Sequence, residues 1–202
     1  MLYKKPATKT MEEMLDKFQI KELLEFERFC RDNSLWDEMN KCFAHDSRVT
    51  ISWYQGSGYG FVEASRKMKN AAPHKVNNIL VWLNGNRAVA VMMASILMRK
   101  KIHQKAVDLT AYVRLVYQLV KQDDEWKIIS LEGIYEKDSL AAVTPPELES
   151  DGFIFTRQSY ANLALLLNKD GYSIADNLPG DDLPETVESM LAEKSGWLQN
   201  AE

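Results

Sequence analysis

The stretch 108–138, DLTAYVRLVYQLVKQDDEWKIISLEGIYEKD, contains two long runs in which residues alternate between apolar and polar. In the first run, one set of alternate positions is apolar throughout: Leu109, Ala111, Val113, Leu115, Tyr117 and Leu119. The second run begins at Trp126 and Ile128, and an acidic segment lies between the runs. Alternation with a period of two over such lengths is typical of β-strands. The stretch therefore predicts an antiparallel hairpin of two long strands joined by a tight turn.

The residues before this hairpin predict helices first and strands later. Thr10 and Glu13 have the spacing of a capping box, and a helix is expected from there to about Arg31. A second short helix is expected around Trp36, Met39 and Phe43. A strand (48–54), a glycine-containing loop and a short helix (62–69) follow. Two apolar runs, 76–83 and 87–101, flank Asn84-Gly85, which is a strong hairpin signal.

This order of elements predicts an α+β fold in which a curved antiparallel sheet carries N-terminal helices on one face. The core domain is expected to span residues 1–145. The composition changes after Pro145, and two helices are expected at 159–168 and 186–198. Their apolar residues are too few for a separate core. Residues 146–202 are therefore interpreted as a helical extension that packs on the sheet or on a partner subunit.

The helices followed by long strands, closing on the WKI and IYEKD segments, resemble a SnoaL-like domain of the nuclear-transport-factor-like superfamily. The resemblance covers about 11–145 and implies a cone-shaped α+β barrel. Scytalone dehydratase and steroid isomerase-type enzymes are relatives of this kind. The resemblance therefore implies a ligand cavity inside the cone, and a homodimer formed through the outer sheet face of residues 87–121.

Composition narrows the possible partners. The net charge is −4 with interspersed signs, so no basic stripe for nucleic acid is present, and no segment is apolar enough to span a membrane. Cys30 and Cys42 lack metal-type spacing and fit buried reduced thiols in a cytoplasmic protein. Nucleotide and zinc motifs are absent from the sequence, so no cofactor and no metal are expected. A small hydrophobic molecule is the expected partner.

Asp32 is the first candidate for a catalytic residue. With Trp36 it resembles the Asp and Trp at the end of the first helix in SnoaL-like enzymes, where the carboxylate faces the cone. A carboxylate in an apolar pocket has a raised pKa and can act as an acid or a base. The alternative is an ordinary helix cap for the helix that follows.

His74 is the second catalytic candidate, because dehydratases of this superfamily place a catalytic histidine at the corresponding strand. With Asn84-Gly85 as the central residues of the turn, His74 is expected to lie opposite Ser95. A histidine beside a carboxylate can exchange protons near neutral pH. The alternative is a partly exposed histidine at the start of a strand.

Further residues are assigned by pattern. Glu132 is expected on the same strand face as Trp126 and opposite Arg114, which favours a cross-strand ion pair over catalysis. His45 is interpreted as a helix-end residue and His103 as part of a solvated loop. The residues expected to contact substrate are Phe29, Trp53, Tyr54, Met93, Ser95 and Tyr117.

These observations favour a cofactor-free lyase or isomerase that acts on a small ring-containing substrate by proton transfer between Asp32, His74 and the substrate. Two alternatives remain. A ligand-binding protein without turnover is favoured by an Asp32 that only caps a helix. An oligomerising interaction module is favoured by a completely filled cone.

Overall fold

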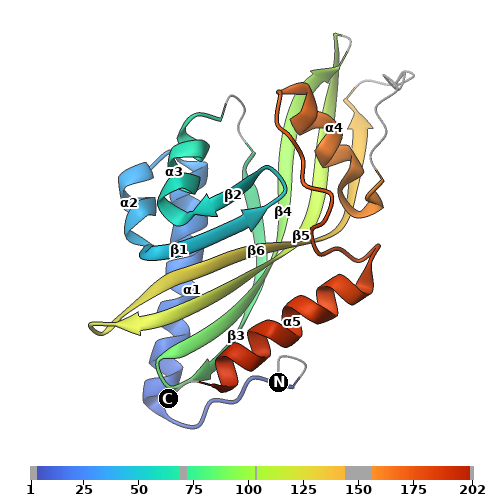
Figure 1. The fold of residues 1–202 in the computed structure, drawn as a ribbon. Helices are drawn as coiled ribbons and strands as arrows, with labels where there is room; N and C mark the ends of the chain where they lie inside the picture. Colours follow the sequence, from blue (N-terminus) through green and yellow to red (C-terminus); the bar gives the residue numbers. More distant parts are fainter. Residues whose placement is uncertain (1–3, 69–71, 103, 144–155, 201–202) are drawn as a thin grey trace.

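The computed structural model describes residues 4–68, 72–102, 104–143 and 156–200 (Figure 1). Helix α1 (Met11–Asp32) begins at the predicted capping box, where the Thr10 Oγ1 accepts a hydrogen bond from the Glu13 N–H at 3.1 Å. Helix α2 (Trp36–Lys41) follows after a tight turn. Strand β1 (Phe43–Ile51) pairs with the short β2 (Tyr54–Ser57), and α3 (Gly58–Arg66) completes this part. His45 lies in β1, so its assignment to a helix end was wrong.

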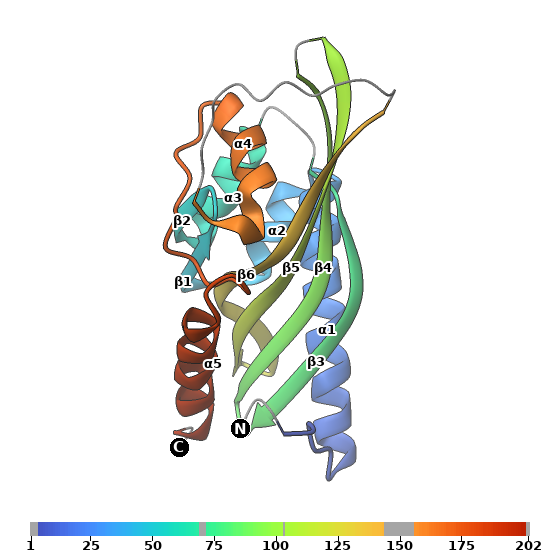
Figure 2. The same ribbon diagram turned by 90° about the vertical axis from the view of Figure 1, so that its right-hand side faces the viewer.

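Four long strands form the remainder of the sheet. They are β3 (His74–Asn84), β4 (Arg87–Ile102), β5 (Lys105–Gln122) and β6 (Glu125–Ala142). The sheet has six strands in the order β2-β1-β6-β5-β4-β3, and only the β1–β6 pair is parallel. It is curved and not closed, as Figure 2 shows. The predicted α+β class and the predicted long hairpin are confirmed.

The first hairpin turn lies one residue from its predicted position, and the second is a tight turn in the acidic segment. Asn84 pairs with Arg87, so Gly85 and Asn86 are the central residues of the first turn, and Gly85 adopts the positive φ of 53° that this turn needs. In the second hairpin Gln122 pairs with Glu125. Its turn is therefore the two residues Asp123-Asp124, with φ of 50° and 65°.

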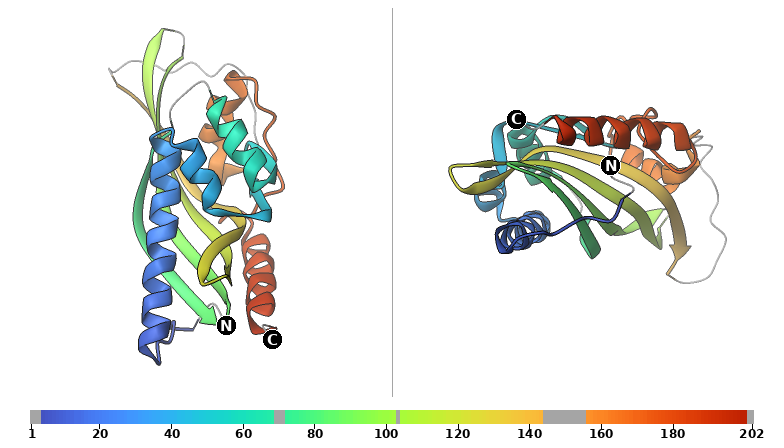
Figure 3. Two further views of the ribbon diagram at one scale, coloured as in Figure 1. Left: turned by 90° about the vertical axis from the view of Figure 1, so that its left-hand side faces the viewer. Right: turned by 90° about the horizontal axis from the view of Figure 1, so that it is seen from below.

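The two faces of the sheet are covered by different parts of the chain. The inner face packs against α1, and the outer face packs against α5 (Pro184–Gln199); the view from below in Figure 3 places these helices on opposite sides of the sheet. The outer cluster joins Trp82, Val89, Val91, Val116 and Ile134 to Val187, Met190, Leu191 and Leu198 of α5. The chain's own tail thus covers part of the face on which a dimer interface was expected.

Helix α4 (Ala161–Lys169) lies at the other end of the molecule, over the inner face (Figures 1 and 2). The Asp138 carboxylate on β6 accepts hydrogen bonds from the Leu163 N–H at 2.8 Å and from the Asn162 side chain at 2.7 Å. The Lys100 ammonium on β4 donates to the Leu166 carbonyl at 2.9 Å and pairs with Asp170. Two strands therefore fix both ends of α4.

The predicted domain boundary at Pro145 lies outside the described residues, and so does His103. Both tail helices fall near their predicted positions, at 161–169 and 184–199. Within the described ranges, no helix is long and apolar enough to cross a membrane.

Candidate functional site

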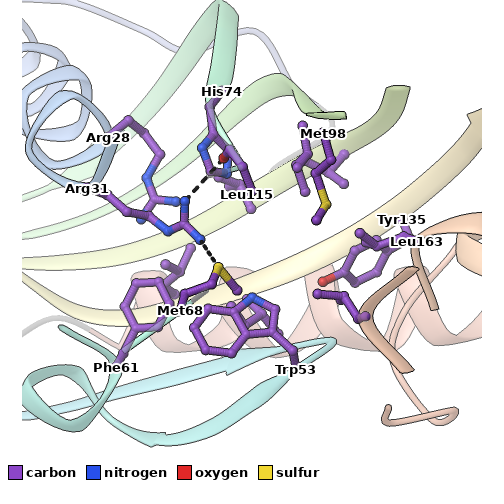
Figure 4. A pocket seen from close by; sticks show the side chains of 16 residues that line it. Arg28, Arg31, Trp53, Phe61, Met68, His74, Met98, Leu115, Tyr135 and Leu163 are labelled. Atoms are coloured by element: carbon purple, nitrogen blue, oxygen red, sulfur yellow. Dashed lines mark hydrogen bonds between the residues drawn. The ribbon is translucent and has the colours of Figure 1, made fainter. Parts of the chain in front are cut away.

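A largely apolar cavity lies on the inner face of the sheet, where α1, α3, five strands and α4 converge (Figure 4). Its apolar wall includes Ile51, Trp53, Phe61, Leu115, Leu163 and Leu167. The polar groups that line it are the side chains of Arg28, Arg31, His74 and Tyr135. The empty space is about 520 Å³ when the open mouth is included, but the volume open to the centre of a water molecule is only about 40 Å³. The cavity is therefore narrow.

Asp32 and His74 form a hydrogen-bonded pair at this cavity. The Asp32 carboxylate accepts a hydrogen bond from the His74 backbone N–H at 2.7 Å, and its Oδ1 lies 2.9 Å from the His74 Nδ1. The side chains are 15% and 6% exposed. The two residues come from the end of α1 and the start of β3, which are far apart in sequence. The two catalytic candidates thus lie within direct hydrogen-bond reach of each other.

The capping alternative for Asp32 is not what the structure shows. The N-cap position of α2 is Leu35, and no side chain caps that helix. Both Asp32 oxygens instead contact His74, and Oδ1 also lies 3.5 Å from the Arg31 Nη1. Asp32 itself does not line the cavity; it stands behind His74 and faces a second, more polar recess with Ser34 and Arg66.

A β-bulge in β3 turns His74 toward the cavity. Along β3, Asn78 pairs with Met93, whereas Val76 pairs with Ala94, so Asn77 is an extra, unpaired residue. Counted from the turn, residues beyond an extra residue lie on the face opposite to the one that an uninterrupted strand would give them. If the pairing that begins at Asn84 and Arg87 continued without a bulge, His74 would pair with Leu97 on the outer face. It pairs instead with Ile96, which lines the cavity, and not with Ser95 as predicted.

The protonation states of the pair follow from its surroundings. Burial, together with the charges of Arg31 and Arg28, lowers the pKa of His74 to about 4, against a raising effect of the hydrogen bond to Asp32. Burial raises the pKa of Asp32, but the hydrogen bonds from His74 and the charge of Arg31 outweigh it, so that this pKa is lowered. At neutral pH the pair is thus a carboxylate and a neutral imidazole.

The carboxylate also selects the tautomer of the imidazole. An ionised carboxylate only accepts hydrogen bonds, so the proton of the neutral ring is on Nδ1. Nε2 then carries the free lone pair, and it has no hydrogen-bond partner among the residues that the structure describes. A histidine in this state can accept a proton from a molecule in the cavity.

Two buried arginines lie beside the pair. Arg28 forms an ion pair with the adjacent Glu27, which is fully buried, and its guanidinium lies 5.9 Å from the centre of the Phe61 ring. Burial opposes the charge of Arg28, yet Glu27 raises its pKa above the ordinary value. Arg31 donates to the Ala72 carbonyl at 3.2 Å and lies 3.6 Å from the Met68 sulfur. Both arginines stand one helical turn apart, on the inner face of α1.

Of the six residues expected to contact substrate, only Trp53 lines the cavity. Phe29 is 54% exposed on the opposite side of α1, and Met93 is 37% exposed on the outer face of the sheet, so both assignments were wrong. Alternation along β4 places Ser95 on that outer face as well. Tyr54 packs behind Trp53, and its hydroxyl donates to the Ser57 carbonyl at 3.0 Å. Tyr117 is fully buried outside the cavity lining.

The ion pair expected for Glu132 exists with a different partner. Glu132 pairs in register with Val116, because Ile129 is an extra residue on β6 opposite Gln118 and Leu119. This bulge moves Glu132 to the outer face, away from Trp126 and Ile128. There Glu132 forms an ion pair with Lys194 of α5. Arg114 pairs with Glu136 at 3.0 Å and with Asp181.

Sequence reasoning missed Arg31, Met68, Tyr135 and the α4 leucines as cavity residues. Tyr135 belongs to the IYEKD segment, but its inward direction depends on the bulge at Ile129. Leu163 and Leu167 repeat at helical spacing, which could have shown that α4 has an apolar face but not what it covers. For Arg31 the available signal was its place in the sequence, directly before Asp32.

Comparison with known families places the chain. The model of the SnoaL-like domain matches residues 12–132, so the protein belongs to this family. The matched range includes Asp32, His74 and both arginines but neither α4 nor α5. The cavity leucines of α4 therefore come from outside the matched region.

Individual relatives are distant. Pea pathogenicity protein 2 of Fusarium vanettenii is 25% identical over 146 residues, which are 68% of this chain and 63% of that protein. A putative scytalone dehydratase of Novosphingobium aromaticivorans superimposes with a TM-score of 0.52 at 15% identity, over 70% of this chain and 97% of that one. A hexachlorocyclohexane dehydrochlorinase of type 3 from Novosphingobium barchaimii gives 0.54 at 12% identity, over 69% and 98%. These solved structures support the fold.

Proposed function

We propose that this protein is a cofactor-free lyase or isomerase that moves a proton on a small, hydrophobic, ring-containing substrate. The observation that carries the proposal is the Asp32–His74 hydrogen bond of 2.9 Å, with His74 at the wall of an apolar cavity. A neutral imidazole held by a carboxylate is a general base that needs no metal or cofactor. Two structural relatives, named as a dehydratase and a dehydrochlorinase, fit an elimination reaction.

In the proposed reaction, Nε2 of His74 accepts a proton from a carbon atom of the substrate. The imidazolium that forms is stabilised by the Asp32 carboxylate on its other side. The same imidazolium then gives the proton to a leaving group or to a second carbon atom. The first outcome is an elimination and the second an isomerisation, and both regenerate the neutral histidine.

The cavity limits what can bind. Its wall of aliphatic and aromatic side chains favours an uncharged, planar or ring-shaped molecule. Because the space is narrow, such a molecule must displace side chains. Met68 and Met98 line the cavity and are unbranched, so their rotamers can change at small cost. Binding is therefore expected to move these two methionines.

A binding protein without turnover is the second candidate. The observation that favours it is the His74 pKa of about 4, since a histidine with that pKa is a weak base at neutral pH. A ligand that develops negative charge beside the imidazolium raises the pKa of His74 and so makes it a stronger base. An inert apolar ligand does not. The two candidates thus differ in whether proton exchange occurs in the cavity.

Hydrogen–deuterium exchange of a bicyclic ketone tests the proposal directly. 2-Tetralone has exchangeable protons beside its carbonyl, and mass spectrometry follows their replacement in D₂O. We expect the protein to accelerate exchange without any added cofactor, and His74→Gln to abolish the acceleration. His45→Gln, at an exposed histidine, is the matched control and should leave exchange unchanged. Equal exchange with the wild type and with His74→Gln contradicts catalysis by this pair.

A further inference from the structure

Arg31 has more hydrogen-bond donors than the described residues use. A guanidinium carries five N–H donors, and a buried one is costly unless they are satisfied. Nη1 donates to the Ala72 carbonyl and lies 3.5 Å from the Asp32 Oδ1. Nη2 has only the thioether sulfur of Met68 at 3.6 Å, which is a weak acceptor, and Nε has no partner among the described residues.

The charge near Arg31 is also incompletely balanced. Arg28 has Glu27 as a close partner, whereas Arg31 shares the Asp32 carboxylate with His74. Burial and, after it, the neighbouring charge of Arg28 lower the pKa of Arg31 to about 10, against the raising effect of Asp32. The guanidinium remains charged at neutral pH, so negative charge that forms next to it is stabilised.

Arg31 lies directly beside His74, the proposed base. Arg31 Nη1 and His74 Nδ1 approach the same Asp32 oxygen, at 3.5 and 2.9 Å, so the guanidinium and the imidazole lie side by side. Figure 4 shows the Arg31 guanidinium between the side chains of His74 and Met68, and Tyr135 farther away. Arg31, Met68 and Ala72 line both the cavity and the polar recess, so they form the wall between the two.

We propose that Arg31 is the oxyanion-stabilising catalytic residue, and that the substrate is a carbonyl compound bound with its oxygen on the Arg31 guanidinium in place of the Met68 sulfur. This inference rests on the proposed function. His74 Nε2 takes a proton from the carbon next to the carbonyl group. The electron pair of that C–H bond becomes part of a C=C bond, and the carbonyl π pair moves onto oxygen. Arg31 binds the resulting enolate.

The second half of the reaction returns the electrons and the proton. The oxygen lone pair reforms the C=O bond, and the C=C pair either expels a leaving group from the next carbon or accepts a proton at a conjugated carbon. The His74 imidazolium gives its proton to the leaving group in the elimination and to the conjugated carbon in the isomerisation. A base and an oxyanion donor must be close for this step, because the proton and the carbonyl oxygen are on neighbouring atoms.

2-Naphthol tests this assignment, because its ionised form resembles a planar enolate and its fluorescence differs from that of the neutral form. We expect wild-type protein to bind 2-naphtholate more tightly than naphthalene, and to hold bound 2-naphthol ionised at a pH where the free compound is neutral. Arg31→Met should weaken naphtholate binding roughly 10- to 100-fold and leave naphthalene binding unchanged. Arg99→Met, at an exposed arginine paired with Asp108, is the matched control and should change neither.

Several results would overturn the assignment. One is a wild-type protein that binds 2-naphthol only as the neutral form, which needs no variant to observe. Another is an Arg31→Met protein that binds naphtholate as tightly as the wild type does. Arg31→Lys, which keeps the charge, would then also show unchanged binding. If 2-tetralone exchange depends on His74 while naphtholate is not held by Arg31, this inference fails and the proposed function stands. If Arg31 holds naphtholate but 2-tetralone exchange is not accelerated, the proposed function fails and the anion-binding role of Arg31 stands.

Discussion

The inner and outer faces of the sheet both bury apolar side chains, but they differ in the charged groups that they carry. The inner face brings Glu27, Arg28, Arg31 and the Asp32–His74 pair into a largely apolar surrounding. The outer face is covered in part by aliphatic side chains of α5, and its ion pairs, such as Glu132–Lys194 and Arg114–Glu136, keep a partner in contact with water. Buried charge is costly, so the inner face loses stability through the same charged groups that the proposed reaction uses. Substitutions on the inner face should therefore change activity, and those on the outer face stability.

The largest expected effect is the loss of activity on the inner face. Asp32→Asn keeps the shape of the side chain but replaces an acceptor with an amide, so the imidazolium loses its stabilising charge and the tautomer is no longer fixed. We expect 2-tetralone exchange to fall about 10²- to 10⁴-fold. Glu132→Gln is the carboxylate control on the outer face and should not alter the rate. Similar losses in both variants would remove the distinction between the faces.

The next effect concerns the seal on the outer face. Leu198 is fully buried between α5 and the sheet, and Leu198→Ala should lower the free energy of unfolding by about 2–4 kcal/mol. Urea denaturation measures this change, and the exchange rate of 2-tetralone should remain that of the wild type. Val143→Ala, at a 43% exposed site just after β6, is the control and should cost less than about 0.5 kcal/mol. If the tail is only loosely attached, the two variants should have the same urea midpoint of unfolding.

The third effect is a dependence of stability on pH that comes from the inner face. The folded pKa of His74 is about 4 and its ordinary value is 6.5, so between these values the unfolded chain binds the extra proton. Stability is therefore complete above pH 6.5 and is lost as the pH falls toward 4, by an amount on the order of 2–3 kcal/mol. The lowered pKa of Asp32 acts in the same direction below its ordinary 3.8. His74→Gln should flatten thermal melting between pH 6.5 and 5, while His45→Gln should not.

A smaller effect is expected at the ion pair of the outer face. Lys194 is 4% exposed and Glu132 24%, so the remaining carboxylate can still reach water when the lysine is removed. Lys194→Met should cost about 1–2 kcal/mol, and the double variant with Glu132→Gln less than the sum. A double-mutant cycle by urea denaturation measures the coupling. Strict additivity would show that the pair contributes nothing.

The smallest effect on activity and stability is expected at the proposed dimer interface. The part of the outer face that α5 leaves uncovered includes Leu80, Met93 and Tyr112, each between 37% and 40% exposed. We propose that a second copy covers this surface. Met93→Asp should then shift sedimentation from dimer to monomer while 2-tetralone exchange stays unchanged. A wild-type protein that sediments as a monomer at micromolar concentration contradicts the proposal.

The fold could be predicted from the sequence because its signals are local. Alternation along 109–119 and the capping box at Thr10 each depend on a few neighbouring residues. The family resemblance also pointed to Asp32 and His74, which the structure places 2.9 Å apart. The remaining site residues depend on which face of a strand or helix points inward. A single bulge at Ile129 reversed the face of Glu132, and Phe29 pointed outward because Arg28 and Arg31 take the inner face of α1.

Because β3 carries one extra residue, the strand can be one residue shorter at that point and keep the same side chains turned to the cavity. Asn77 is exposed and contributes only a backbone step, so many side chains can replace it without harm. Its removal would restore regular pairing, with Val76 opposite Ala94 directly before Asn78 opposite Met93, and His74 would stay opposite Ile96 on the inner face. Variation among relatives should thus include both substitutions and a one-residue gap at this position. A second deletion between His74 and the turn has no bulge to absorb it, and would turn the imidazole to the outer face.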